Sequence, residues 1–352
     1  MRYRLTKKNA KLLGRTHAID GTLWLSLSAS GAEWKFTGTS CKVTLAGDSM
    51  ALDEIHSPRF AVEVDGVRII DTTLVECKTR TLVAVSSGTP ATHVVRVLKL
   101  SESADSTLGI VSVECDGVPE PTPAAELAIE FVGDSITCGY GVDGTINDLY
   151  RTANEDATKA YAYRAAQMLS ADYSLVSFSG YGIISGYTET GRIRPECVVP
   201  PIYGTMGDSY GAFAGREIPS EIAWDFSKFT PDIVVINLGT NDASYCGEDN
   251  ARAREYINAY KAFLATVRAC NPQAYLVCAL GTMDVRLCGA METAAEEYRA
   301  EARDERVATL RLTLQDMERD GVVVDWHPSA VTHSKAAKEI AAFLRGLPLG
   351  GR

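Results

Sequence analysis

The chain has 352 residues, of which 46% are hydrophobic and 23% are charged, and its formal net charge is −10. This composition is typical of a folded globular protein and excludes a disordered or fibrous chain. So acidic a surface would repel phosphate backbones and anionic lipid headgroups, so we expect neither nucleic acid nor a membrane as a partner. The length favours two domains.

The first residues, Met1–Lys8, are basic, but no apolar stretch typical of a signal peptide follows them. We therefore expect a cytoplasmic protein, or a secreted one if a leader was removed. The nine cysteines form no Cys-x-x-Cys pair, and we expect most of them to be reduced and buried. Cysteine and histidine residues are scattered without the spacing of metal ligands, so we expect no metal and no cofactor.

The first third of the chain predicts a domain of β-strands. Short runs of Val, Ile, Leu, Phe and Thr alternate with turn residues, and no amphipathic helix separates them. Asp65-Gly66 is typical of a two-residue hairpin. Consecutive strands of this kind predict a β-sandwich of the jelly-roll type with its own core. The expected strands cover residues 23–28, 34–38, 41–46, 60–64, 68–72, 81–85, 93–100 and 110–115.

Three prolines between Gly117 and Pro123 indicate an extended connector, because proline cannot donate to a sheet ladder. We therefore place the β-sandwich at residues 1–118, a linker at 119–125 and a second domain at 126–352.

After the linker, buried apolar strands alternate with amphipathic helices, which predicts a parallel sheet covered by helices on both faces, an α/β/α fold. In such sheets, reactive groups collect at the carboxyl ends of the strands. The expected strands are 127–132, 173–178, 233–238, 275–280, 307–312 and a shorter one at 322–324, and the expected helices are 157–169, 251–269, 292–305 and 334–344.

Polar motifs follow these strands at the points where the strands end. Ser135 lies in Gly133-Asp134-Ser135 after the first strand, and Asn241 lies in Gly-Thr-Asn-Asp after the third. His327 follows the short late strand, within Asp-Trp-His-Pro-Ser. A serine hydroxyl needs a general base, usually histidine, to become a nucleophile, and the oxyanion it generates needs preorganised donors. The motifs therefore indicate a serine hydrolase with Ser135 as nucleophile and His327 as base.

Four ordered blocks between residues 131 and 327 resemble the SGNH hydrolases: Gly-Asp-Ser, a mid-chain glycine, Gly-x-Asn-Asp and the late Asp-x-His. The β domain, the Leu13–Thr16 opening and the block around His327 resemble carbohydrate esterase family two in particular. The resemblance implies a jelly roll joined to an SGNH α/β/α domain and an O-deacetylation of plant polysaccharide or oligosaccharide. It implies an oxyanion hole made by the Ser135 N–H, Asn241 and a glycine of the second block.

The residues leave several alternatives open. Counting from the strand end favours Gly182 over Gly180 as the oxyanion-hole glycine. Asp325 precedes His327 by two residues instead of the three usual in SGNH enzymes, so either Asp325 or a backbone carbonyl orients the imidazole. His333 is a competing base, which we interpret as a surface residue near a helix N-terminus.

Aromatic residues close to the motifs are candidates for contact with a sugar ring: Trp326, Tyr140 and Tyr181, with Tyr187 as a further possibility. Cys138, three residues after Ser135, is interpreted as a packing residue because a thiol nucleophile needs its own base and a positive environment.

The predicted reaction is the removal of acetyl groups from mannan- or xylan-type carbohydrate through an acyl-enzyme. The alternatives are an SGNH lipase or thioesterase acting on other acyl esters, and a carbohydrate-binding protein without catalysis.

Overall fold

The computed structural model describes residues 1–349, which form two compact units. We call them the β unit and the α/β unit. The β unit contains Met1–Ala125, Leu149–Thr158 and Gly204–Trp224, and the α/β unit contains Glu126–Asp148, Lys159–Tyr203 and the described residues from Asp225 onwards. Two segments that the sequence prediction placed in the second domain are thus part of the β unit.

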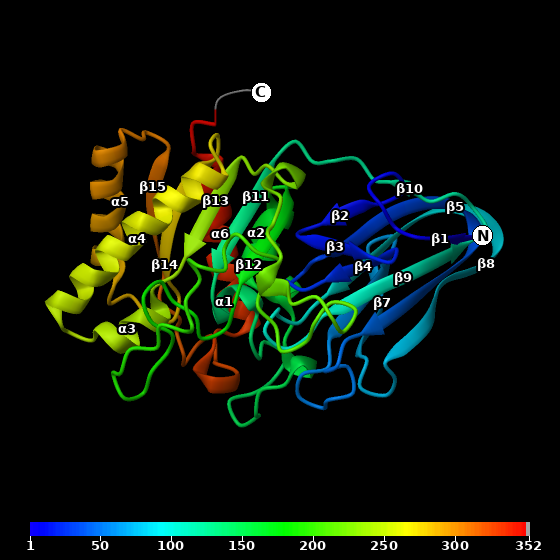
Figure 1. The fold of residues 1–352 in the computed structure, drawn as a ribbon, viewed down its shortest axis with the longest axis horizontal. Helices are drawn as coiled ribbons and strands as arrows, with labels where there is room; N and C mark the ends of the chain where they lie inside the picture. Colours follow the sequence, from blue (N-terminus) through cyan, green and yellow to red (C-terminus); the bar gives the residue numbers. More distant parts are fainter. Residues whose placement is uncertain (350–352) are drawn as a thin grey trace. The chain divides into compact units, whose positions relative to one another are not determined.

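The β unit is built on one antiparallel sheet of ten strands (Figure 1). Its main path runs β3-β4-β9-β5-β8-β6-β7, with β1 paired to β9, and with β2 and β10 paired to β5. The strands are β1 Arg2–Tyr3, β2 Lys11–Leu13, β3 Thr16–Ile19, β4 Thr22–Leu25, β5 Gly31–Gly47, β6 Arg59–Val64, β7 Val67–Thr73, β8 Thr79–Lys99, β9 Leu108–Cys115 and β10 Glu120–Pro121.

Two pairs of expected short strands are in fact single long strands, β5 and β8. They pair with each other along most of their length, and the residues expected to break them are accommodated as register shifts, one of them between Gly38 and Ser40. The expected hairpin at Asp65-Gly66 joins β6 to β7, and both residues have positive φ, 52° and 82°. The apolar faces of these strands enclose a core that includes the fully buried Trp34 and Phe60.

The expected linker contains β10, which pairs with Trp34 and Lys35 of β5. Proline is tolerated in such a position because a short edge strand needs few ladder bonds. The segment therefore continues the sheet of the β unit for two residues before the α/β unit begins.

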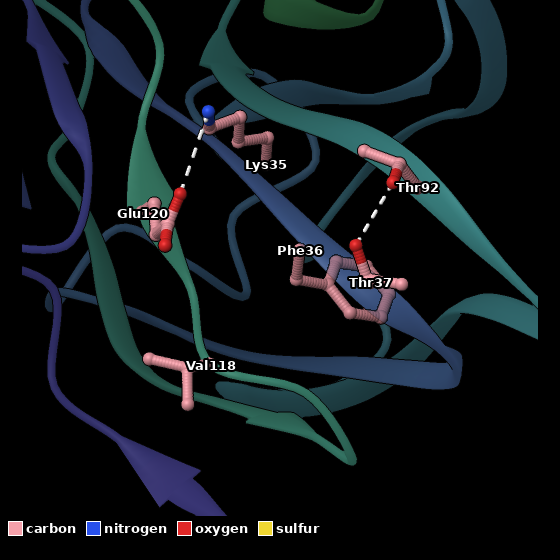
Figure 2. A pocket seen from close by; sticks show the side chains of 6 residues that line it. All are labelled: Lys35, Phe36, Thr37, Thr92, Val118 and Glu120. Atoms are coloured by element: carbon pink, nitrogen blue, oxygen red, sulfur yellow. Dashed lines mark hydrogen bonds and ion pairs between the residues drawn. The ribbon is translucent and has the colours of Figure 1, made fainter.

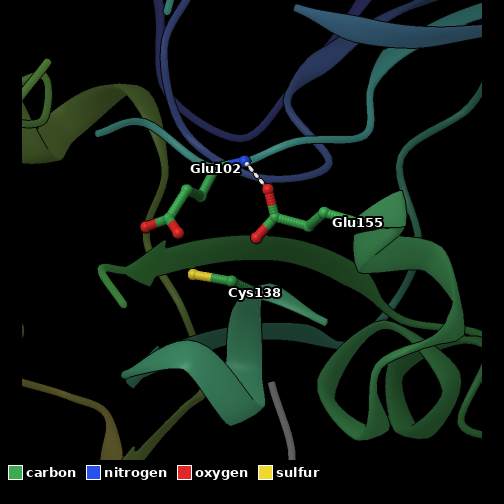
Figure 3. A group of neighbouring side chains, drawn as sticks. All are labelled: Glu102, Cys138 and Glu155. Carbon is green, nitrogen blue, oxygen red and sulfur yellow. Dashed lines mark hydrogen bonds between the residues drawn. The ribbon is translucent and has the colours of Figure 1, made fainter. Parts of the chain in front are cut away.

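Buried polar groups hold Leu149–Thr158 in the β unit. Glu155 accepts a hydrogen bond from the Glu102 N–H at 2.7 Å (Figure 3) and another from the Tyr150 hydroxyl at 2.9 Å. Asp156 pairs with Arg68 at 2.7 Å. Burial raises the pKa of Glu155 well above its usual value, with the nearby carboxylates of Glu102 and Asp105 adding to the effect.

The α/β unit contains a five-stranded parallel sheet in the order β12-β11-β13-β14-β15 (Figure 1). Helices α4 and α5 pack together, as do α2 and α6. The chain steps from β11 to β12 in one direction along the sheet and from β13 to β15 in the other, so the general rule of right-handed crossovers puts these two pairs on opposite faces. The strands are β11 Ala128–Gly133, β12 Asp172–Ser177, β13 Ile233–Asn237, β14 Tyr275–Gly281 and β15 Val307–Leu312. The helices are α1 Ser135–Cys138, α2 Tyr161–Met168, α3 Thr240–Cys246, α4 Asn250–Cys270, α5 Cys288–Ala302 and α6 Ala330–Arg345, with single 3₁₀ turns η1 Thr152–Asn154, η2 Ala157–Lys159, η3 Pro219–Glu221, η4 Phe226–Lys228 and η5 Val324–Trp326.

The strand expected at 322–324 does not form in the described chain. Val322 forms only an isolated bridge with Pro328, and residues 324–326 form η5. The apolar run there is too short to pair with a neighbouring strand and instead folds into the turn that carries His327. Among the described helices, none has the length and apolar character that a membrane span requires.

Candidate active site

Ser135 lies at the first position of α1, directly after the carboxyl end of β11. Asp134 caps this helix by accepting the Ile136 N–H at 3.0 Å, and Gly139 ends it with a φ of 78°. Gly133 has to be glycine, because a Cβ there would lie 2.0 Å from the Thr137 hydroxyl oxygen. The short strand-to-helix turn therefore holds the Ser135 hydroxyl at the edge of the sheet.

The imidazole of His327 contacts this hydroxyl. Nε2 lies 2.8 Å from Ser135 Oγ, and Nδ1 lies 3.1 Å from the Val324 carbonyl oxygen. A carbonyl oxygen can only accept, so Nδ1 carries the proton and Nε2 is free to take the serine proton. Burial lowers the pKa of His327 to about 4, so the ring is neutral near pH 7 and available as a general base.

Asp325 does not occupy the place of the third triad member. Its Oδ2 accepts a hydrogen bond from the Tyr140 hydroxyl at 2.9 Å, while the Val324 carbonyl accepts the hydrogen bond from Nδ1–H. The cause is the backbone, because Asp325 and Trp326 both have left-handed φ values, 48° and 64°. Two such residues in a row turn the Val324 carbonyl towards the ring. Of the two alternatives, the geometry therefore supports the backbone carbonyl.

Not all of the N–H groups expected to form the oxyanion hole are available in the structure. The Gly182 N–H donates to the Cys197 carbonyl at 3.2 Å and is therefore engaged in a bridge between two loops. The N–H groups of Ser135 and Gly180 have no hydrogen-bond partner within residues 1–349. Of the two glycines between which the sequence left a choice, Gly180 is therefore the one whose N–H is not engaged within the described residues.

Asn241, near the N-terminus of α3, is 6% exposed and turns its amide towards the same place. Its Nδ2 donates to the Tyr181 carbonyl at 2.8 Å and more weakly to Asp134 Oδ2 at 3.4 Å. A developing oxyanion would replace the longer bond, while the shorter one holds the amide in position.

Asp242 has a structural role that the sequence analysis did not assign to it. Its fully buried carboxylate accepts the backbone N–H groups of Ile183, Ile184 and Ser185 at 2.7 to 3.1 Å. Burial raises the pKa of Asp242 to about 6. The adjacent Asn241 and Asp242 thus tie the loop after β12 to α3. Only the Asn-Asp pair after a buried strand hinted at such a role.

The aromatic candidates lie in different environments. Trp326 is 60% exposed next to His327, as a sugar-stacking residue would be. Tyr181 packs on Phe178 with ring centroids 5.5 Å apart, and Tyr187 is half exposed. Tyr140 instead packs on His327 itself, with centroids 4.4 Å apart.

His333 and Cys138 are both inside the α/β unit. His333 is 1% exposed, where the sequence predicted a surface residue, and its Nδ1 accepts the Tyr161 N–H at 3.2 Å. The apolar face of α6 buries it. Cys138 is fully buried with its thiol 3.2 Å from the Ser177 hydroxyl. Neither offers a second nucleophile–base pair.

The β unit has a separate hollow of about 340 Å³, shown in Figure 2. A Lys35–Glu120 ion pair at 3.4 Å and a Thr37–Thr92 hydrogen bond at 2.8 Å satisfy its polar groups. Its lining residues include no histidine or cysteine, in contrast to the Ser135–His327 pair of the α/β unit.

Comparison with known proteins gives two family matches. Residues 131–343 match the GDSL-like lipase/acylhydrolase family, and residues 12–124 match the carbohydrate esterase 2 N-terminal family. Cellulase/esterase CelE of Acetivibrio thermocellus is 29% identical over 90% of this chain and 37% of its own length. An acetylxylan esterase / glucomannan deacetylase of Cellvibrio japonicus is 27% identical over 72% of this chain and 66% of its own length. The chain thus spans between about a third and two thirds of these relatives.

Solved structures extend the likeness to both units. A family two carbohydrate esterase from Clostridium thermocellum, in complex with cellohexaose, has a TM-score of 0.81 and 27% identity over 96% of this chain and 98% of that one. An acetyl xylan esterase from Butyrivibrio proteoclasticus shares the fold with a TM-score of 0.88, at 24% identity over 98% of this chain and 97% of that one.

Proposed function

The chain belongs to the GDSL-like lipase/acylhydrolase family, and from this membership we propose that it is a serine esterase that removes O-acetyl groups from plant-type carbohydrate. The observation that carries the proposal is the 2.8 Å contact between Ser135 Oγ and the neutral His327 Nε2, beside two unengaged backbone N–H groups of the described chain. This is the set of groups that acyl transfer requires.

The reaction proceeds in two steps. His327 Nε2 takes the proton of the Ser135 hydroxyl as Oγ attacks the acetyl carbonyl, and the N–H groups of Ser135 and Gly180 with the Asn241 amide stabilise the oxyanion. The imidazolium then returns its proton to the departing sugar oxygen, which leaves an acetyl-serine. Water, deprotonated by the same imidazole, releases acetate and restores the serine.

The carbohydrate part of the proposal has two supports. The curated relatives are named as a cellulase/esterase and as an acetylxylan esterase / glucomannan deacetylase, and the β unit matches the carbohydrate esterase 2 N-terminal family. Trp326 offers an exposed aromatic face one residue before the base, and such faces stack on sugar rings. Xylan- and mannan-type substrates are the two candidates.

The test is acetate release from acetylated xylo- and manno-oligosaccharides, with the products followed by mass. We compare the wild type with Ser135→Ala, and with Ser227→Ala as a control on an exposed turn, where the serine hydroxyl contacts Asp225. Loss of acetyl units with the wild type and the control, but not with Ser135→Ala, is expected. Turnover by folded Ser135→Ala would refute the mechanism. Activity that rises from acetyl to octanoyl esters would favour a lipase or thioesterase, and binding of oligosaccharide without hydrolysis would favour a non-catalytic protein.

A further inference from the structure

Tyr140 connects the catalytic base to the acidic residue that precedes it. Its ring packs on the His327 imidazole with centroids 4.4 Å apart and planes inclined by 34°, and its hydroxyl donates to Asp325 Oδ2 at 2.9 Å. The Asp325 side chain is therefore hydrogen-bonded to Tyr140 and not to the imidazole, since Nδ1–H donates to the Val324 carbonyl.

The backbone around Tyr140 fixes this side chain to both ends of the site. The Tyr140 N–H donates to the Ser135 carbonyl at 3.1 Å. The flanking Gly141 has a φ of 60°, and a Cβ on it would lie 2.5 Å from Val324 Cβ. The loop after α1 therefore lies directly against the residue whose carbonyl binds Nδ1, and only glycine permits that approach.

The Tyr140 ring can restrain the imidazole of His327, which the Val324 carbonyl by itself holds only weakly. That carbonyl accepts both the His327 backbone N–H, at 3.0 Å, and the Nδ1 proton, so its bond to the ring is shared. A shared bond to a neutral acceptor sets the tautomer but restrains the ring less than a carboxylate does. An aromatic face on one side of the imidazole limits its rotation and attracts the positive charge that forms when the serine proton is taken up.

We propose that Tyr140 is a positioning residue for the proposed esterase reaction: its ring holds the His327 imidazole towards Ser135, and Asp325 acts by anchoring the Tyr140 hydroxyl. The inference rests on the proposed function. It replaces two expectations for these residues, a direct Asp325–imidazole bond and a sugar-binding role of Tyr140.

The test is a double-mutant cycle on a small acetyl ester such as p-nitrophenyl acetate, which has no sugar to bind. Tyr140→Phe and Asp325→Ala each remove the same hydrogen bond, so each should lower kcat by the same factor, roughly 3- to 10-fold, and the double variant should be no worse than either single one. Tyr140→Leu removes the ring and should lower kcat about 100-fold with KM little changed.

Two further measurements separate positioning from general stability. Tyr275→Leu removes a tyrosine ring at the start of β14, at the amino end of the strand and away from the carboxyl ends where Ser135 lies, and should leave kcat unchanged while thermal melts report any loss of fold. Labelling of Ser135 by an organophosphonate ester should slow in step with kcat, because it depends on the same base. If Tyr140→Leu unfolds, the Tyr140→Phe and Asp325→Ala pair still carries the test.

Each contrary outcome has a distinct meaning. Additive losses, with Asp325→Ala far more damaging than Tyr140→Phe, would show Asp325 acting on the imidazole by itself and would overturn the inference. Full activity of Tyr140→Leu on the small ester, with a raised KM only for oligosaccharides, would make Tyr140 a sugar contact and would also overturn it. A wild type that neither hydrolyses acetyl esters nor is labelled at Ser135 would refute the proposed function, and the inference with it.

Discussion

Replacing Asp242 by alanine should damage both the stability and the activity of the α/β unit. The Asp242 carboxylate accepts the N–H groups of Ile183, Ile184 and Ser185, and these are its partners in the described chain. Asp242→Ala would leave three backbone donors unpaired, those of Ile183 and Ser185 in the interior and that of Ile184 half-buried. It would also release the loop that carries Gly180 from α3.

The expected loss of stability in Asp242→Ala is the difference between two opposing contributions. An unpaired buried donor costs about 1–3 kcal/mol, so the two buried donors would cost about 2–6 kcal/mol, and the half-buried Ile184 N–H would add to this. Removing Asp242 also removes a buried charge, and the rise of its pKa to about 6 shows that burial outweighs the donated hydrogen bonds. Losing the buried charge is favourable and offsets part of the cost of the unpaired donors. We therefore expect the free energy of unfolding to fall by about 3 kcal/mol, towards the lower end of this range.

The assay is urea unfolding of the wild type and the variant, with esterase kinetics at a temperature where both are folded. Asp249→Ala is the matched control, since Asp249 also accepts two backbone N–H groups, from Ala251 and Arg252, but at the exposed N-terminus of α4. The control should lose about 1 kcal/mol and keep its kcat, whereas Asp242→Ala should lose at least roughly 10-fold in kcat because the Gly180 N–H moves. Equal stability losses in the two variants, or an unchanged kcat in Asp242→Ala, would refute the reasoning.

Two further predictions concern the base and the second-block glycines. Since the reaction needs neutral His327, whose pKa burial lowers to about 4 from 6.5, kcat/KM should fall only as the pH drops through about 4; an acid limb near 6.5 would contradict the buried base. Over the same interval the unfolded state binds a proton that the native state does not, so the free energy of unfolding should also decrease as the pH falls from 6.5 to 4. A Cβ on Gly182 would lie 2.2 Å from the Ser185 carbonyl oxygen, whereas one on Gly180 would meet no atom within 4 Å and would only strain a φ of 79°. Thermal melts should therefore show Gly182→Ala to be the more destabilised variant, and the reverse order would argue against the close packing of Gly182 on Ser185.

Much of the architecture could be predicted from local pattern. Alternating apolar strands and amphipathic helices predicted the parallel sheet, and the rule that reactive groups lie at the carboxyl ends of such strands brought Ser135, Asn241 and His327 to one place. Each of these residues directly follows a strand or apolar run, so its position along the chain determined its position at the sheet edge. The β-strands of the first domain were equally visible, although the unbroken length of β5 and β8 was not.

The tertiary structure decided which atoms meet. The Gly182 N–H is engaged by the carbonyl of Cys197, which lies in a later loop, and no spacing rule reports such a partner. The left-handed conformation of the consecutive residues Asp325 and Trp326 could not be predicted from the sequence either, because a bulky tryptophan rarely adopts it. This conformation nevertheless places the Val324 carbonyl where it accepts the hydrogen bond from His327 Nδ1. Periodicity and motif order depend on neighbours in the chain and can be read from the sequence, whereas hydrogen-bond partners depend on contacts between distant segments and exist only in the folded protein.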